Sequence, residues 1–182
     1  NKDDILNIIK KFKSSEINCE IVIIDNGKNF RNYLANDDRL KYIFNNKHIG
    51  YANAHNLSIK HLNKIHKYHL FSNVDLDIDY SDENDVLKIL YNFMEMNDEC
   101  GIVGPKILDE NGNLYDSCKL LPTPIDIFLG KISEKFRNII SDYSINIKAI
   151  SSKAHIPFIS GCFLFCKRKA LEEINFMDKN FF

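Results

Sequence analysis

The sequence predicts an α/β domain in which a mainly parallel sheet is flanked by helices. Along the first 105 residues, short β-branched apolar runs alternate with segments whose apolar residues recur at helical spacing. The second half differs, because Asn111-Gly112 separates two short apolar stretches and predicts an antiparallel ribbon. We therefore expect one domain, residues 1–182, with a first half at 1–105 and a second half at 106–182.

The first half is expected to contain three helices and four strands. Apolar residues at helical spacing predict helices over residues 3–14, 52–65 and 81–94, and Ser81-Asp82-Glu83 is expected to cap the third. Apolar runs closed by turn residues predict strands over residues 20–25, 41–44, 69–74 and 101–105. The run Ile21 to Ile24 is continuous, which is typical of a strand covered on both faces.

The second half is expected to begin with the hairpin and to continue with a long amphipathic helix over residues 125–143. A polar loop at 144–153, an apolar strand at 156–166 and a helix at 169–174 follow. Packing on the sheet is favoured for the long helix. Its interspersed Lys and Arg residues leave open peripheral contact with an anionic membrane.

Composition narrows the function classes. The formal charge is −1, from 24 basic and 25 acidic residues, so the chain lacks the positive field of nucleic-acid binders. Five cysteines without a CxxC pair indicate a reducing compartment, and no apolar run approaches the roughly 20 residues of a membrane span. We expect a cytoplasmic protein. Because the chain lacks an initial Met and stops at Phe181-Phe182, we also expect both ends to be boundaries within a longer protein.

Acidic and amide side chains follow the predicted strands, where open α/β sheets bind ligands. Asp25 and Asn26 close one strand, and Asn73, Asp75 and Asp77 follow another. Two oxygen ligands one residue apart can share Mg²⁺ or Mn²⁺, which typically takes one or two carboxylates plus substrate phosphates. The alternative interpretation is that these residues are solvated turn formers.

A further segment, from Asn46 to Asn56, is expected to begin a helix. Small residues at Gly50, Ala52 and Ala54 would allow this helix N-terminus to approach a ligand closely, and helix N-termini favour phosphate. The segment thus predicts a phosphate contact near the same edge of the sheet. Each residue also has a purely structural interpretation, as a turn or as core packing.

The order of these segments resembles the family 2 inverting glycosyltransferases, and in particular the rhamnosyltransferase-like branch that builds bacterial surface polysaccharides. The similar segments and their family motifs are Ile24 to Gly27 with "VDNxS", Ile49 to Asn56 with "NxGfaxaxN", Asn73-Val74-Asp75 with the "NPD" variant of the DxD motif, Gly101 to Ile107 with "vGivgPki", and Phe158 to Leu164 with "vsGaf". The sequence departs from the motifs at Lys28 and Asn29, which replace a small hydroxyl residue, and at Val74, which replaces proline.

The resemblance implies a GT-A fold, truncated at both ends, and transfer of a sugar from a nucleoside-diphosphate-sugar to a hydroxyl of a growing glycan with inversion. It implies a hexosyltransferase of surface polysaccharide biosynthesis at the inner face of the cell membrane, with a glycan or lipid-linked acceptor. Donor-binding residues carried over from the family are Asp25, Asn26, Gly50, Asn56, Asn73, Ser160 and Gly161. A divalent cation, Mn²⁺ or Mg²⁺, would bind Asp75, joined by Asp77 if the motif is aligned as a literal DxD.

The same resemblance places the catalytic base after Phe182 and the first strand of the sheet before Asn1, so the piece is expected to be inactive alone. Two alternatives remain open at this point. One is a non-catalytic nucleotide- or glycan-binding scaffold with the same fold. The other is a nucleotidyltransferase, against which stands the lack of a Gly-rich basic loop in the sequence.

Overall fold

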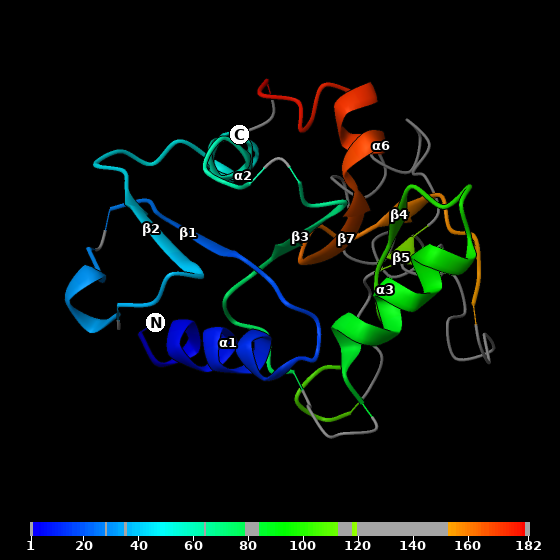
Figure 1. The fold of residues 1–182 in the computed structure, drawn as a ribbon, viewed down its shortest axis with the longest axis horizontal. Coiled ribbons are helices and arrows are strands. Elements are labelled where there is room, and N and C mark those ends of the chain that lie inside the picture. Colours follow the sequence, from blue (N-terminus) through cyan, green and yellow to red (C-terminus); the bar gives the residue numbers. More distant parts are fainter. Residues whose placement is uncertain are drawn as a thin grey trace, which may run out of the picture. The chain divides into compact units, whose positions relative to one another are not determined.

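The computed structural model describes residues 2–27, 29–34, 36–63, 65–78, 84–112, 118–119 and 153–180. The chain divides into two compact units, one formed by Asn1–Val103 with Cys162–Phe182 and the other by Gly104–Gly161. This division falls close to the expected boundary between residues 105 and 106, but the C-terminal segment belongs with the first unit (Figure 1).

The first unit contains helices and strands in alternation. Its elements are α1 (Lys2–Ser14), β1 (Ile21–Asp25), the short 3₁₀ helix η1 (Arg31–Tyr33), β2 (Leu40–Phe44), α2 (Tyr51–Ile59), β3 (Tyr68–Ser72), α3 (Val86–Met96), β4 (Ile102–Val103), β7 (Phe163–Lys167) and α6 (Arg168–Glu173). In the second unit β5 (Cys118–Lys119) pairs antiparallel with β6 (Phe158–Ile159). The mixed α/β class expected from the sequence is therefore present.

The sheets of the first unit are not mainly parallel, contrary to expectation. β1 and β2 form a parallel pair, from Ile21 opposite Leu40 to Asp25 opposite Phe44. The other sheet has the order β3-β7-β4, and β7 is antiparallel to both neighbours. The alternating pattern did not reveal that β7 would lie between β3 and β4. The central position of β7 agrees with its burial, since Phe163 is 3% and Cys166 2% exposed.

The prediction for α1 is confirmed, since the helix covers Lys2–Ser14 and buries the apolar stripe Ile5, Ile8, Ile9 and Phe12. Acidic residues occupy its first turn and lysines its last, which suits the helix dipole. In Figure 1, α1 and α2 lie on opposite faces of the layer that contains β1 and β3. The two helices thus enclose the central strands from both sides.

The predicted N-cap of α3 is wrong. The helix begins at Val86, and the cap is Asp85, whose carboxylate accepts a hydrogen bond from the Lys88 N–H at 3.1 Å. The same carboxylate accepts from the Ser15 hydroxyl at 2.8 Å and from the Glu16 N–H at 2.8 Å. Asp85, rather than one of residues 81–83, caps α3 because its carboxylate also bonds to the end of α1. The local sequence pattern does not show this tertiary contact.

The apolar stretch 156–166 is not one strand, because a turn at Gly161 and Cys162 separates β6 from β7. A turn is present at Asn111-Gly112, with the Gly112 N–H donating to the Asp109 carbonyl at 2.9 Å and Gly112 at φ +77°, and the hairpin itself stays a prediction. Its second arm at 114–115, the cap residues 81–83, the helix at 125–143 and most of the loop at 144–153 lie outside the described residues. In the part of the chain that is described, no helix is long and apolar enough to cross a membrane.

Candidate functional site

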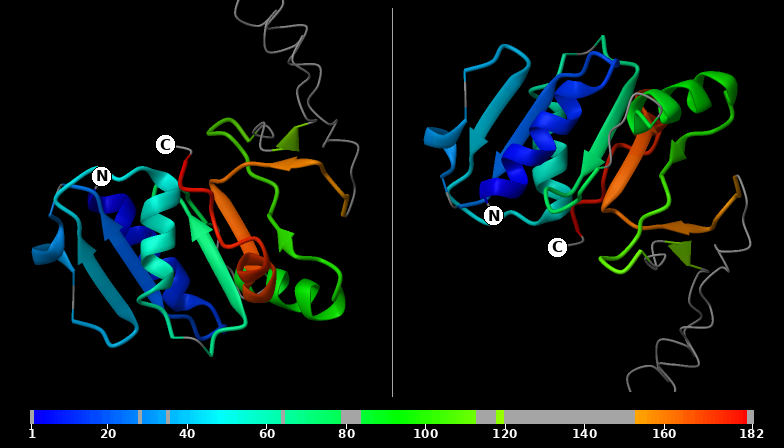
Figure 2. Two further views of the ribbon diagram at one scale, coloured as in Figure 1. Left: turned by 90° about the horizontal axis from the view of Figure 1, so that it is seen from above. Right: turned by 90° about the horizontal axis from the view of Figure 1, so that it is seen from below.

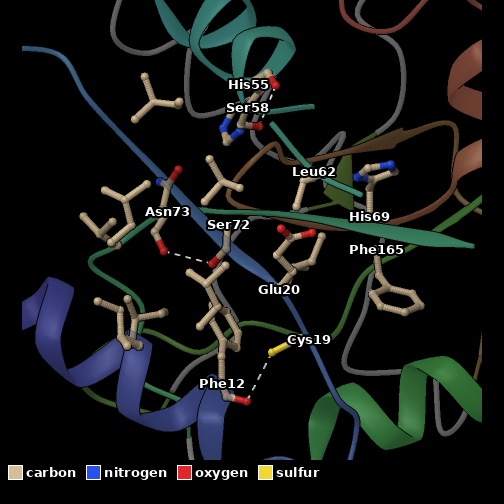
Figure 3. Close-up of a pocket in the computed structure, with 18 of the residues that line it drawn as sticks. Phe12, Cys19, Glu20, His55, Ser58, Leu62, His69, Ser72, Asn73 and Phe165 are labelled. Carbon is tan, nitrogen blue, oxygen red and sulfur yellow. Dashed lines mark hydrogen bonds between the residues drawn. The ribbon is translucent and has the colours of Figure 1, made fainter. Parts of the chain in front are cut away.

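Three segments predicted to bind a ligand open onto one cavity of about 1230 Å³ in the first unit. Asn26 follows β1, Gly50 precedes α2, and Asn73 and Asp75 follow β3, and all four line this cavity. The close-up in Figure 3 shows Asn73 beside Ser72 at the end of β3, with His55 and Ser58 on the α2 side. The strand ends and the helix start therefore border the same cavity, which also extends along β1 and β3 to the residues that precede them. That these residues bind one ligand stays a prediction.

Asp25 organises the loop that follows β1. Its Oδ1 accepts a hydrogen bond from the Gly27 N–H at 3.1 Å, and its Oδ2 accepts from the Phe30 N–H at 2.9 Å and the Tyr42 hydroxyl at 2.5 Å. The residue is only 7% exposed. Both carboxylate oxygens thus accept hydrogen bonds from the protein's own N–H and hydroxyl groups. These bonds fix the loop beside the cavity. That Asp25 contacts the nucleobase or ribose stays a prediction.

Tyr42 is a site residue that the sequence did not reveal. Burial, together with the hydrogen bond to Asp25, raises the pKa of Tyr42 to about 12, so the phenol keeps its proton and remains a donor. Its hydroxyl oxygen also accepts from the Phe30 N–H at 2.9 Å. Only the parallel register that places β2 beside β1 brings Tyr42 to Asp25, and no sequence signal marks it.

The loops after β1 and β2 are joined through Asn45. Its N–H donates to the Asp25 carbonyl at 2.8 Å, and its Nδ2 donates to Asn26 Oδ1 at 3.3 Å and to the Lys47 carbonyl at 2.7 Å. The hydrogen bond from Asn45 thereby holds the side chain of Asn26, a residue that lines the cavity. This coupling gives the carboxyl-end loops a common, fixed geometry.

Gly50 is the N-cap of α2 and has φ +79°, a conformation that side chains disfavour. Its carbonyl accepts the Ala54 N–H at 3.1 Å, which closes the first turn of the helix. Helix N-termini direct N–H groups and a partial positive charge outward. Because Gly50 and Tyr51 both line the cavity, the start of α2 forms part of its wall.

The two candidate metal ligands lie in different surroundings. Asp75 is exposed and lines the cavity, whereas Asp77 is absent from the described residues that line it. Asp77 instead faces α1, where its Oδ1 accepts from Asn7 Nδ2 at 3.3 Å and lies 3.9 Å from Lys11 Nζ. Asp75 is therefore the better-placed carboxylate.

A cation site built by the protein alone is not found within the described ranges, which contain no group of three or more His, Cys, Asp or Glu residues suited to a metal. A magnesium or manganese site that is completed by substrate needs fewer protein ligands, because one or two carboxylates suffice when phosphate oxygens supply the others. The exposed carboxylate of Asp75 fits that donor set.

Asn56, which the resemblance assigns to donor binding, bonds to another part of the chain. Its Nδ2 donates to the Met177 carbonyl at 2.7 Å, and its Oδ1 accepts from the Met177 N–H at 3.1 Å. The amide therefore fixes the segment after α6 onto α2, and its role in donor binding stays a prediction. Ser160 and Gly161 lie in the second unit, which is described by itself, so their predicted place near the sugar also stays a prediction.

Two histidines line the same cavity, and of these His69 is buried and His55 half-buried. Burial lowers the pKa of His55 to about 4, and its ring packs edge-on against Tyr51 and Phe71, with centroids 4.2 and 5.0 Å away. Burial, with a smaller contribution from the charge of Arg168, lowers the pKa of His69 to about 4. Both imidazoles are neutral at pH 7 and act as packing groups.

The chain has no match among protein-family models, curated proteins or solved structures.

Proposed function

We propose that this protein binds a nucleoside-diphosphate-sugar at the carboxyl ends of β1 and β3 and transfers the sugar, with inversion, to a hydroxyl of a glycan acceptor. The observation that carries the proposal is the meeting of Asn26, Gly50, Asn73 and Asp75 on one cavity. These residues come from three separate segments that resemble the nucleotide-binding motifs of family 2 glycosyltransferases. The order of the motifs and the geometry of the loops support the same assignment.

In this proposal each segment has a distinct role. The loop held by Asp25 and Asn45 receives the nucleoside, because it is rigid and presents Asn26 to the cavity. The start of α2 at Gly50 faces the diphosphate, whose negative charge suits a helix N-terminus. Asp75 is the ligand of a divalent cation, which would neutralise charge on the departing diphosphate.

Nucleotide binding is the most direct test of the site. We expect UDP, GDP or dTDP to bind the protein in calorimetric titrations with Mn²⁺, and Asp75→Ala to weaken binding by at least about tenfold, since it removes a charged ligand of the metal. The fold should persist, because Asp75 is exposed and supports no core. Circular dichroism would verify the fold.

Asp77→Ala is the matched control, since Asp77 is an equally acidic neighbour that faces α1. Its affinity for nucleotide should stay within about twofold of the original. If a folded Asp75→Ala protein kept full affinity, the metal assignment would be withdrawn. If Asp77→Ala lost affinity instead, the literal DxD alignment would be the right one.

A further inference from the structure

The chain that follows α6 turns back toward α2 within the first unit. In Figure 1 and in the left view of Figure 2 this segment, drawn in red, runs from the end of α6 to the side of α2. Residues 175–180 are called the strap below. Phe176 and Met177 are half-buried, whereas the other residues of the strap are exposed. No residue of the strap lines the cavity of the candidate site.

The end of α6 is a Schellman motif. The Phe176 N–H donates to the Leu171 carbonyl at 2.7 Å, and the Asn175 N–H donates to the Glu172 carbonyl at 3.1 Å. Asn175 has φ +59°, which is the left-handed conformation that this motif requires of one residue. Asparagine tolerates that conformation better than most side chains do. The helix therefore ends in an ordinary way as far as Asn175.

Phe176 is a second left-handed residue, which the Schellman motif does not need. Its φ of +66° is rare for a bulky side chain, because Cβ lies too close to the following carbonyl oxygen. Strained backbone of this kind persists only where surrounding contacts offset its cost. The contacts of Phe176 and of the residue after it therefore decide whether the strap keeps its observed course.

Two kinds of contact hold the strap on the unit. Phe176 and Met177 pack against a cluster of buried apolar residues from α2, β3, β7 and α6. The cluster comprises Ile59, Phe71, Cys166 and Leu171. The Asn56 side chain adds two hydrogen bonds, since its Nδ2 donates to the Met177 carbonyl at 2.7 Å and its Oδ1 accepts from the Met177 N–H at 3.1 Å. One amide thus satisfies both backbone groups of a residue 121 positions away.

The polar attachment of the strap beyond Phe176 depends on Asn56. Asp178 Oδ1 accepts from the N–H and from Nδ2 of Asn180, both at 2.9 Å, so these bonds stay inside the strap. Within the described residues, residues 177–180 make no hydrogen bond to the rest of the unit except the two to Asn56. Loss of one side chain would therefore leave the strap attached by apolar packing alone, against the strain at Phe176.

We propose that the strap is a conformational device, which Asn56 holds closed and which opens as one piece while α2 and α6 stay folded. In the closed state the amide and the apolar cluster together keep Phe176 at positive φ. In the open state Phe176 relaxes to negative φ, and Phe176 and Met177 leave the cluster, which becomes accessible to solvent. Segments with few contacts open at low free energy, and moving parts of proteins are drawn from them. Asn56 acts through the strap, and this inference does not depend on the proposed function.

Nuclear magnetic resonance of the 182-residue protein tests the closed state. Backbone chemical shifts should report positive φ at Phe176. The N–H groups of Phe176 and Met177 should exchange through one common opening, at similar rates once intrinsic exchange is corrected for. The Arg168 N–H, which donates to the Lys67 carbonyl at 2.9 Å, is the reference and should exchange at least about 100-fold more slowly. Negative φ at Phe176, or a strap as protected as Arg168, would overturn the proposal.

Asn56→Ala tests the role of the amide, since alanine favours the helix and removes both bonds to Met177. The Phe176 N–H keeps its own acceptor in this variant, yet we expect it to exchange at least about tenfold faster and φ at Phe176 to lose its positive value. Alkylation of Cys166, which is 2% exposed, reports whether the cluster opens. Its rate, mapped by mass spectrometry, should also rise at least about tenfold.

Asn53→Ala is the matched control, because Asn53 lies on the same helix and its Nδ2 donates to the nearby Ile49 carbonyl at 2.9 Å. Both rates should stay within about twofold of the original in this control. Unchanged Phe176 exchange or unchanged Cys166 alkylation in folded Asn56→Ala would overturn the proposal. Equal acceleration in Asn53→Ala would overturn it too, by assigning the effect to α2 itself. If Asn56→Ala does not fold, Asn56→Asp, which loses only the donor, is judged by the same two rates.

Discussion

At the scale of single residues, the candidate site depends on side chains that hold loops as much as on side chains that face the cavity. Asp25, Asn45 and Tyr42 bond to each other or to the loop backbone at the carboxyl ends of β1 and β2. Sequence pattern identified Asp25, because a carboxylate closing a buried strand is conspicuous. It missed Tyr42 and Asn45, whose importance comes only from the register of β1 with β2.

Tyr42→Phe should lower the free energy of unfolding by about 2 kcal/mol, since it removes a hydrogen bond to a buried carboxylate. The measurement is urea unfolding followed by circular dichroism. Tyr33→Phe is the control, because Tyr33 is 53% exposed, and its effect should stay within about 0.5 kcal/mol. Equal effects of the two substitutions would mean that the Tyr42 to Asp25 bond contributes nothing to stability.

At the scale of elements, Asp85 couples two helices. Burial favours a higher pKa for this carboxyl, but hydrogen bonds from the Lys88 and Glu16 N–H groups and from Ser15 outweigh it and hold the pKa below its usual range. Asp85→Ala should therefore destabilise the protein by about 2 to 3 kcal/mol, because it removes a helix cap and the link to the end of α1.

Asp85→Asn is the matched comparison, since asparagine caps helices about as well as aspartate and keeps one carbonyl acceptor. Its loss of stability should be less than half that of the alanine variant in the same urea titration. Equal losses in the two variants would assign the contribution of Asp85 to its charge alone, against the capping account.

At the scale of the whole molecule, His55 and His69, whose pKa values are both lowered, make stability depend on pH. Their folded-state pKa values of about 4 lie below the ordinary value of 6.5, so between pH 6.5 and 4 the unfolded chain binds protons that the folded chain does not. Stability should fall as pH decreases through this window, by about 2 kcal/mol at pH 5 from His69 alone.

Urea midpoints at pH 5 and 7.5 would measure this dependence. His69→Phe should reduce the difference between the two midpoints, whereas substitution of the exposed His61 by Gln should leave it unchanged. An undiminished difference in His69→Phe would show that His69 does not titrate as a buried neutral group. A smaller, residual difference is expected from His55, whose pKa is also lowered to about 4.

The sequence by itself determined those features that depend on neighbouring residues. Local periodicity fixed α1 and its buried stripe, the apolar run of β1, and the polar residues that close β1 and β3. Only the tertiary structure decided which distant segments meet: β7 between β3 and β4, the Asn56 amide on Met177, and Asp77 against α1 rather than beside Asp75. These contacts join residues far apart in the chain, and the choice among them depends on which arrangement buries most apolar surface and satisfies most backbone hydrogen bonds, quantities that no local pattern contains.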